Sequence, residues 1–359
     1  MVFLLPRRVC DKLWGEPLPP SDSFQGQTVL ITGANSGLGR AAAVHFANLG
    51  ANLILTARNL VNGHTAAEYV ETCTGIVGQG RVQVLELDMS RYSSCVSFVS
   101  QLKQQTASCA GHLDVAVLNA GLINVDFKLS PEGWEQTIQV NTLSTTLLGL
   151  LLLEWMGQQP TSQAESGPPH IVFVTSRDHL DPDITPWEEY AAQTGGLLKY
   201  FSDEQNWPRG VLDPNYAVSK LALTYAVESL CERAVRADGR VNVVVNTVCP
   251  GLVSTSLGRS MAESSRWLKV LVPIHQRLLG KSADFGARFY VKAARTSIDE
   301  HGKYIQSLFT EDEYRRLSAP NLRSQTALKV RGIVWKEIMT DLVDKIPSLS
   351  GLNLAVGGH

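Results

Sequence analysis

The chain has 359 residues, of which 44% are hydrophobic and 18% charged, and its formal net charge is -2 at pH 7. This length suits one large α/β domain with insertions, or two domains. The near-neutral charge and the lack of a basic aromatic stripe argue against a nucleic-acid partner or a membrane-surface footprint and favour small-molecule chemistry.

The N-terminal residues 1–25 contain several prolines and predict an irregular arm. The apolar cluster at the start is too short for a secretory signal. The longest apolar run, residues 147–153, is far below the ~18 residues that span a bilayer, so we expect no transmembrane segment. The six cysteines and eight histidines show no ligand spacing, which predicts reduced thiols, no metal site and a cytoplasmic location.

Strands and helices alternate after the arm. The strand candidates are mostly runs of Val, Ile and Leu, which suit parallel strands covered on both faces. They cover residues 28–32, 52–57, 82–88, 113–119, 171–176 and 241–248, with a short edge strand at 303–306. We therefore predict an α/β fold with a Rossmann-type doubly wound parallel sheet of about seven strands and helices on both faces.

Periodic apolar segments between the strands predict the helices. They cover residues 38–49, 62–73, 92–106, 131–156, 214–237 and 283–294, and an extra C-terminal helix follows at 322–346. A long insertion at 178–213 and another irregular segment at 252–282 interrupt the alternation. The main domain is thus predicted at 26–310, and a C-terminal helical extension at 311–359.

A glycine-rich turn joins the first strand to the first helix. It consists of Thr32-Gly33-Ala34-Asn35-Ser36-Gly37-Leu38-Gly39. Glycines allow positive φ and let backbone N–H groups approach a pyrophosphate, to which the helix N-terminus adds partial positive charge. The turn indicates dinucleotide binding, although a tight strand-to-helix turn without a ligand would use the same residues.

A tyrosine and a lysine, Tyr216 and Lys220, stand four residues apart on one predicted helix. The spacing places both on one face, where the ammonium favours the phenolate and lowers the pKa of the phenol toward neutrality. An amphipathic helix can also present such a pair without any function. Ser176 ends a strand of the parallel sheet, where a hydroxyl either bonds a substrate oxygen or forms a turn.

Two further polar positions follow the fourth strand. Asn119-Ala120-Gly121 lies at its end, and Asn141 stands in the next helix between apolar residues. An amide in that place either satisfies a backbone carbonyl or holds a water, or does both.

The order of these motifs resembles the short-chain dehydrogenases/reductases over residues 26–310, where Pro250-Gly251 completes the pattern. The N-terminal arm, the long segment before Tyr216 and Gly302-Lys303-Tyr304 extend the resemblance to the retinol-dehydrogenase-like branch, particularly to its fungal members in secondary-metabolite pathways. The resemblance implies an oxidoreductase that interconverts a ketone or aldehyde and an alcohol on a bulky apolar small molecule.

The resemblance also implies a role for each matched residue. Tyr216 is the proton donor or acceptor, Ser176 orients the carbonyl, and Lys220 lowers the tyrosine pKa and binds the nicotinamide ribose. Asn141 anchors a water relay. The implied cofactor-binding residues are Gly33, Asn35, Ser36, Gly37, Leu38, Gly39, Arg58, Asp88, Asn119, Ala120, Gly121, Tyr216, Lys220, Val253 and Thr255.

Cofactor choice is predicted from the end of the second strand. An acidic residue there would bind the ribose 2′-hydroxyl of NAD, whereas Arg58 stands there and can meet the 2′-phosphate of NADP(H). Alternatively, Arg58 lies on a solvated loop and does not bind the cofactor. Ser36 stands where many NADP-dependent members of the family have a second basic residue. An NAD-linked alcohol dehydrogenase and an idle cofactor-binding regulator remain the rival functions, although Ser176, Tyr216 and Lys220 are all intact.

The two irregular segments are expected at the mouth of the site, the insertion on one side and residues 252–282 as a substrate lid on the other. Aromatic residues of the insertion either line an apolar pocket or pack the loop, and His179 either touches substrate or is an ordinary loop histidine. The aromatic residues are Trp187, Tyr190, Tyr200, Phe201 and Trp207. The family resemblance suggests a homo-oligomer, unless the C-terminal helix covers the association surface.

Overall fold

The computed structural model describes residues 16–109, 112–159, 167–208, 214–253 and 280–351. Within these segments the chain forms a seven-stranded parallel sheet in the order β3-β2-β1-β4-β5-β6-β7, which confirms the predicted fold class. Most strands are one to three residues shorter than predicted. They are β1 Thr28–Ile31, β2 Asn52–Ala57, β3 Val82–Glu86, β4 Val115–Leu118, β5 His170–Val174, β6 Val244–Val248 and β7 Tyr304–Ile305.

The chain winds outward from β1 in both directions. β1 pairs with β2 on one side and with β4 on the other. At such a reversal of strand order, the loops that follow the strands diverge and leave a crevice at their carboxyl ends. The segments after β1, β4 and β5 border this crevice, and they carry the glycine turn, Asn119 and Ser176.

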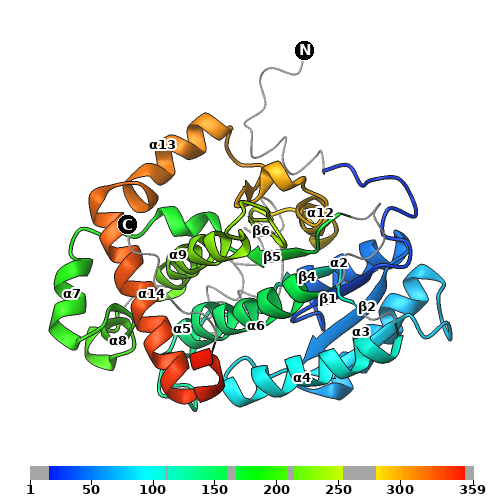
Figure 1. Cartoon of the computed structure of the whole chain (residues 1–359), viewed down its shortest axis with the longest axis horizontal. Coiled ribbons are helices and arrows are strands. Elements are labelled where there is room, and N and C mark those ends of the chain that lie inside the picture. Colours follow the sequence, from blue (N-terminus) through cyan, green and yellow to red (C-terminus); the bar gives the residue numbers. More distant parts are fainter. Residues whose placement is uncertain (1–15, 110–111, 160–166, 209–213, 254–279, 352–359) are drawn as a thin grey trace, which may run out of the picture.

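Helices cover both faces of the sheet (Figure 1). Val29 and Ile31 of β1 belong to one apolar cluster, and Leu30 belongs to the other, because successive side chains of a strand point to opposite faces. The first cluster includes residues of α2 (Gly37–Asn48), α3 (Leu60–Thr74) and α12 (Ala283–Ala293). The second includes residues of α4 (Tyr92–Cys109), α6 (Thr145–Gln158) and α9 (Tyr216–Ala234).

The helix predicted at 131–156 begins later and is not uniform. It starts as α5 (Gln136–Ile138), passes through a π-helical turn (Gln139–Ser144) and continues as α6. The carboxylate of Glu135 fixes the start, because it accepts hydrogen bonds from the backbone N–H groups of Thr137 and Ile138. The preceding residues form a turn in which Gly133 has a φ of +90°.

The C-terminal helix predicted at 322–346 is present as α14 (Gln325–Lys345), and a further helix that was not predicted, α13 (Glu311–Leu322), precedes it. A capping box between Thr310 and Glu313 starts α13, and the hydroxyl of Ser324 caps α14 by accepting from the N–H of Ala327. α14 packs along α9 and against the insertion (Figure 1).

The insertion contains helical structure that the sequence analysis did not predict. After the short helix η2 (Arg177–Leu180) come α7 (Trp187–Thr194), α8 (Leu197–Phe201) and a short helical turn, Glu204–Asn206. Glu337 of α14 accepts hydrogen bonds from the backbone N–H groups of Leu198 and Lys199, at 2.9 Å each. The C-terminal extension therefore caps α8 and fixes the insertion on the domain.

Four aromatic residues of the insertion pack on one another. Tyr190 stacks on Tyr200 with ring centroids 4.1 Å apart, and Trp187 meets the edge of Phe201 at 5.3 Å. Trp187 is only 2% exposed and belongs to the core cluster that includes α14. Trp207 is half-buried and lies edge-on to Phe127 at 5.4 Å.

Removal of the Trp187 ring is expected to destabilise the fold. We expect Trp187→Ala to lower the free energy of unfolding by about 3–5 kcal/mol, because a fully buried large ring leaves a cavity. Urea denaturation followed by circular dichroism measures this loss. Trp207→Ala is the matched control and should cost clearly less, since Trp207 is half-buried; equal losses would contradict the assignment of Trp187 to the core.

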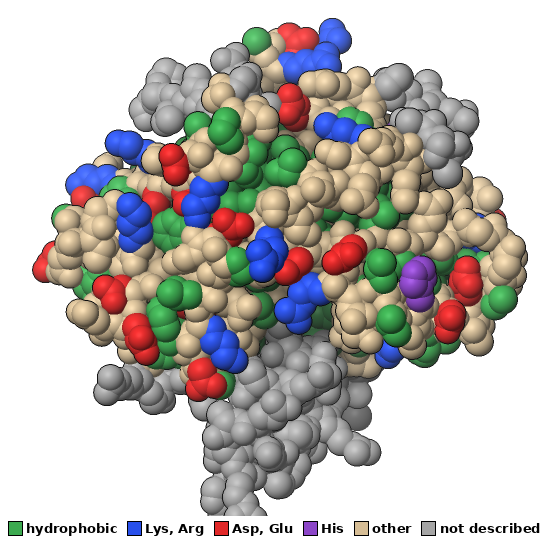
Figure 2. All heavy atoms as spheres, turned by 90° about the horizontal axis from the view of Figure 1, so that it is seen from below, with side chains coloured by type: hydrophobic (Ala, Val, Ile, Leu, Met, Phe, Trp, Pro, Cys, Tyr) green, Lys and Arg blue, Asp and Glu red, His purple; other side chains and the backbone are tan. Residues whose placement is uncertain are grey.

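None of the helices in the described segments combines the length and apolarity that a membrane span requires. On the face drawn in Figure 2, Lys and Arg side chains are interspersed with Asp and Glu. Among the described residues, no three His, Cys, Asp or Glu side chains gather as metal ligands. The described cysteines Cys73, Cys95, Cys231 and Cys249 are free thiols.

Candidate active site

The glycine turn between β1 and α2 has no room for a side chain at Gly33 or Gly39. Gly33 and Gly37 have φ values of +65° and +56°. A Cβ on Gly33 would lie 3.0 Å from the Cα of Ala120, and one on Gly39 would lie 2.6 Å from the carbonyl oxygen of Gly33. The first turn of α2 contains no acidic residue, and the Ser36 side chain does not cap it. This turn therefore presents backbone N–H groups to an anion such as a pyrophosphate.

Asn119, directly after β4, braces this turn. Its Nδ2 donates to the carbonyl oxygens of Thr32 at 2.9 Å and Gly33 at 3.2 Å, and its Oδ1 accepts from the hydroxyl of Tyr290 at 2.9 Å. The N–H of Ala120 donates to Thr32 Oγ1 at 2.9 Å. The amide of Asn119 is thus used within the protein, and it holds the end of β4 against the glycine turn.

The residues predicted for the adenosine end lie at neighbouring strand ends. Arg58 is exposed directly after β2, and Asp88 is half-buried two residues after β3. One carboxylate oxygen of Asp88 accepts from the N–H of Ser90 at 3.0 Å and from its hydroxyl at 2.8 Å. The other carboxylate oxygen of Asp88 lies 3.9 Å from Nε of Arg91. Asn35 is exposed on the glycine turn.

Leu38 and Val253, both predicted to bind the cofactor, meet at one glycine of α12. A Cβ on Gly286 would lie 2.8 Å from Leu38 Cδ2 and 2.7 Å from Val253 Cγ2. The segment after β6 therefore reaches the start of α2, across the crevice. Thr255, the other predicted residue of this segment, lies outside the described residues, as does most of the predicted lid.

Tyr216 and Lys220 lie in the first turns of α9, and both are largely buried. The ammonium nitrogen of Lys220 lies 5.6 Å from the ring centroid of Tyr216 and donates to the carbonyl oxygen of Val174 at 3.0 Å. Burial lowers the pKa of Lys220 to about 8, and the charge of nearby Asp178 offsets part of this effect. The lysine thus joins the tyrosine to the carboxyl end of β5.

Ser176 follows β5 and precedes η2. Its Oγ accepts a hydrogen bond from the N–H of Asp178 at 3.3 Å, and the residue is partly exposed. Lys220 donates to the backbone carbonyl of Val174, the last residue of β5. Ser176 is only two residues further along the chain. The structure therefore brings the serine and the tyrosine–lysine pair to one strand end.

Asn141 lies in the π-helical turn, a feature that is frequent at functional sites. Its Oδ1 accepts from the N–H of Leu122, and its Nδ2 donates to the carbonyl of Leu122 and to Ser219 Oγ, all within 3.0 Å. A Cβ on Gly121 would lie 3.1 Å from Asn141 Oδ1 and 3.7 Å from Lys220 Nζ. The amide satisfies a backbone carbonyl, one of the two expected roles, and packs close to the lysine.

The sequence analysis missed two residues that connect these helices. Glu135, at the start of α5, is fully buried, and burial raises its pKa. Asn215, directly before Tyr216, donates through Nδ2 to Glu135 Oε2 at 3.2 Å and to the carbonyl of Phe201 at 2.7 Å. The starts of α5 and α9 and the end of α8 therefore meet at one point. Glu135 and Asn215 stand out only because their side chains are buried in the structure. No motif or spacing in the sequence marks them.

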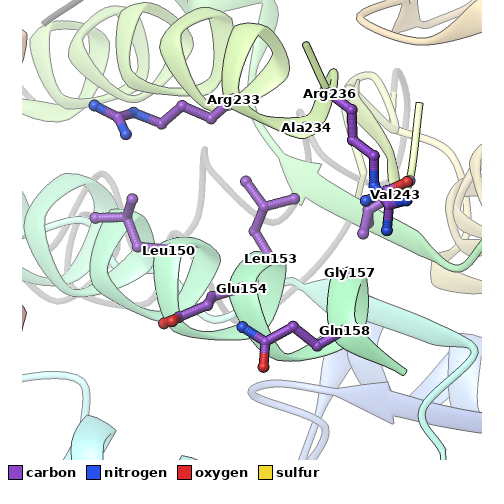
Figure 3. Close-up of a pocket in the computed structure, with 10 residues that line it drawn as sticks. Leu150, Leu153, Glu154, Gly157, Gln158, Arg233, Ala234, Arg236 and Val243 are labelled. Atoms are coloured by element: carbon purple, nitrogen blue, oxygen red, sulfur yellow. The ribbon is translucent and has the colours of Figure 1, made fainter. Parts of the chain in front are cut away.

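A surface groove of about 350 Å³ lies between the ends of α6 and α9 (Figure 3). Its lining includes Gly157 and Gln158 on one helix and Arg233 and Ala234 on the other. Arg233 is about 25 Å along the helix from Tyr216 at the usual rise per residue. This groove is therefore remote from the tyrosine–lysine pair and is a separate surface feature.

The fold and these residues define a dinucleotide-binding α/β oxidoreductase. The chain belongs to the short-chain dehydrogenase/reductase family: residues 27–203 match the family model described as short chain dehydrogenase. A short-chain dehydrogenase/reductase of Aspergillus flavipes is 32% identical, over 94% of this chain and 93% of the relative. A short chain dehydrogenase of Emericella nidulans is 35% identical, over 80% of this chain and 86% of the relative.

Solved structures share the fold. Salutaridine reductase from Papaver somniferum has a TM-score of 0.58 at 20% identity and covers 77% of this chain and 98% of its own. A short chain dehydrogenase of Escherichia coli, complexed with NADPH, has a TM-score of 0.56 at 21% identity and covers 79% of this chain and 98% of its own. At these identities the likeness establishes the fold.

Proposed function

We propose that the protein is an NADP(H)-dependent short-chain dehydrogenase/reductase that interconverts a ketone or aldehyde and an alcohol on a bulky apolar small molecule. The observation that carries the proposal is the buried ammonium of Lys220, held between the ring of Tyr216 and the strand end that leads to Ser176. A charged lysine in such a place favours the phenolate form of a neighbouring tyrosine. It therefore suits proton transfer at a carbonyl oxygen.

The residues divide the chemistry between them. When bound, the nicotinamide supplies a hydride in reduction and takes one in oxidation. In reduction, the hydroxyl of Ser176 donates a hydrogen bond to the substrate oxygen, and Tyr216 transfers its proton to that oxygen. Lys220 stabilises the phenolate that remains, and Asn141 anchors the water chain that returns the proton.

The glycine turn fits the cofactor that this chemistry needs. Its backbone would hold the pyrophosphate, because Gly33 and Gly39 leave no space for a Cβ and the first turn of α2 carries no acid. Asp88 and the end of β4 would line the adenosine, Arg58 would meet the 2′-phosphate, and Leu38 with Val253 would lie near the nicotinamide. Lys220 would bind the ribose.

Arg58 is expected to determine the preference for NADPH. We expect Arg58→Ala to weaken NADPH binding by ~1.5–3 kcal/mol, the range for hydrogen bonds to charged groups, and to leave NADH binding almost unchanged. Fluorescence titration of both cofactors measures this difference. Equal losses for the two cofactors would assign Arg58 to another part of the nucleotide.

Proton binding at Lys220 predicts a pH-dependent cofactor affinity. Burial lowers the pKa of Lys220 to about 8, so the side chain is an ammonium below that pH and becomes neutral above it. Only the ammonium attracts the anionic cofactor. We expect the Kd for NADPH to rise above pH 8 in the wild type. The Lys220→Met variant should lack this rise, and its persistence there would assign the titration to another group.

The function is tested by incubating the purified chain with a panel of bulky ketones and NADPH, followed by absorbance of the reduced cofactor. Turnover that prefers NADPH supports the proposal. A clear preference for NADH would favour the NAD-linked alcohol dehydrogenase, and cofactor binding without turnover of any ketone or alcohol would favour the idle regulator.

The proposal keeps three further expectations from the sequence resemblance: a place in secondary metabolism of the polyketide or terpenoid class, the retinol-dehydrogenase-like branch and a cytoplasmic location. The similar dehydrogenases named above come from fungi, as that resemblance expects. α14 covers part of α9. Whether the protein forms a homo-oligomer through the remaining helix surfaces is measured by light scattering.

A further inference from the structure

The short helix η2, directly after Ser176, is held by a helix from the far end of the sequence. Asn321, near the end of α13, donates through Nδ2 to three backbone carbonyls of this segment. Their residues are His179 (3.3 Å), Leu180 (3.2 Å) and Pro182 (3.0 Å). Asn321 is buried, and its backbone carbonyl oxygen accepts a hydrogen bond from the hydroxyl of Tyr225 on α9 at 2.6 Å.

His179 provides a second connection to α13. It is fully buried, with Nδ1 at 2.5 Å from the carbonyl oxygen of Ser176 and Nε2 at 3.1 Å from the hydroxyl oxygen of Tyr314. Burial lowers the pKa of His179 to about 4, so the ring is neutral at neutral pH. Because a carbonyl only accepts, Nδ1 carries the proton and Nε2 accepts from the Tyr314 hydroxyl.

The histidine is therefore not a substrate contact, because both of its nitrogens are bonded within the protein. Aromatic rings hold it in place: Tyr314 stacks on Tyr304 of β7 at 4.5 Å, and Tyr304 meets the edge of His179 at 5.1 Å. The Ser176 carbonyl thus fixes the tautomer, and the Tyr314 hydroxyl donates to the nitrogen that this tautomer leaves without a proton. This connection ends on the backbone of the proposed catalytic serine.

We propose that Tyr314 and Asn321 of α13 are positioning residues that fix the Ser176 hydroxyl through His179 and the η2 backbone. The inference rests on the role of Ser176 in the proposed function. A hydroxyl that orients a substrate carbonyl must be held within a fraction of an ångström. The Ser176 hydroxyl accepts from the N–H of Asp178 in η2, so a displacement of η2 would move the hydroxyl as well.

A double-mutant cycle tests this connection on the full chain. The variants are Tyr314→Phe, Ser176→Ala and their combination, and the probe reaction is the reduction of phenanthrenequinone, a bulky apolar diketone, by NADPH. We expect Tyr314→Phe to lower kcat by about five- to tenfold, the effect of one lost hydrogen bond, while the KM for NADPH stays unchanged. In the Ser176→Ala background the same change should have no further effect.

Tyr92→Phe is the matched control. The Tyr92 hydroxyl donates to Asp341 of α14 at 2.7 Å, so it also ties the C-terminal extension to the domain, but away from η2. It should leave kcat unchanged. Asn321→Asp is a second variant, which keeps the size of the side chain but removes the donors, and it should show the same dependence on Ser176.

A readout independent of turnover is NMR of the His179 ring nitrogens. We expect Nδ1 to keep its proton in both variants, because the Ser176 carbonyl still accepts from it. Tyr314→Phe should shift the Nε2 resonance, because that nitrogen loses its donor, and Tyr92→Phe should leave the resonance unchanged. An unchanged kcat in Tyr314→Phe and Asn321→Asp, or losses that add to that of Ser176→Ala, would overturn the inference. If wild-type turnover is absent or survives Ser176→Ala, the proposed function itself fails.

Discussion

Tyr216→Phe is expected to lower kcat by roughly a hundredfold or more, because the ring still packs but has no proton to transfer. Tyr216 is 8% exposed and is the first residue of α9. The variant should therefore fold normally and bind NADPH with nearly unchanged affinity. Steady-state kinetics with a ketone substrate, together with NADPH fluorescence titration, measure both quantities.

The thermal midpoint of Tyr216→Phe, compared with that of Tyr92→Phe, separates a lost proton donor from a damaged fold. Tyr92 is a buried tyrosine whose hydroxyl donates to Asp341 on α14. Tyr92→Phe therefore removes a buried tyrosine hydroxyl at a position away from the proposed site. Turnover near that of the wild type in Tyr216→Phe would remove the tyrosine from the mechanism.

Lys220→Ala is expected to reduce turnover by roughly a hundredfold and cofactor affinity by more than about tenfold. In the proposed function one ammonium serves both purposes, and in the structure it lies 5.6 Å from the Tyr216 ring and donates to the end of β5. The neutral side chain would neither favour the phenolate nor bind the ribose. Stopped-flow kinetics and cofactor titration measure the two losses separately.

Lys220→Met is the companion variant, because methionine fills the buried space without charge. If both variants lose turnover and affinity alike, the charge is responsible. If turnover or cofactor affinity is lost in Lys220→Ala but normal in Lys220→Met, the lysine contributes to that quantity by packing and not by its charge. Unchanged cofactor affinity in both variants would contradict the proposed ribose contact.

Much of the fold was predictable because local sequence patterns match the structure around them. The β-branched runs became the strands of one sheet, and the glycines at 33 and 37 took the positive φ that the turn requires. Tyr216 and Lys220 fell on one turn of a helix because their spacing matches its period. Each of these features depends on neighbours close in the sequence.

The features that the sequence analysis missed depend on distant partners. The bond from Asn215 to Glu135 joins residues eighty positions apart, and no local pattern specifies a buried carboxylate. The aromatic residues of the insertion pack inward because α14 covers them, a contact that composition does not show. The capping box at Thr310 was a local signal for α13 that went unused.

The bond from Glu337 to α8 has a consequence for synthesis on the ribosome. The insertion is made early, but the carboxylate that accepts its backbone N–H groups is more than a hundred residues later in the chain. Until that helix emerges, the nascent protein exposes the apolar side of Trp187 and Leu197, which are buried in the finished fold. Apolar surface that is exposed in an incomplete chain favours aggregation.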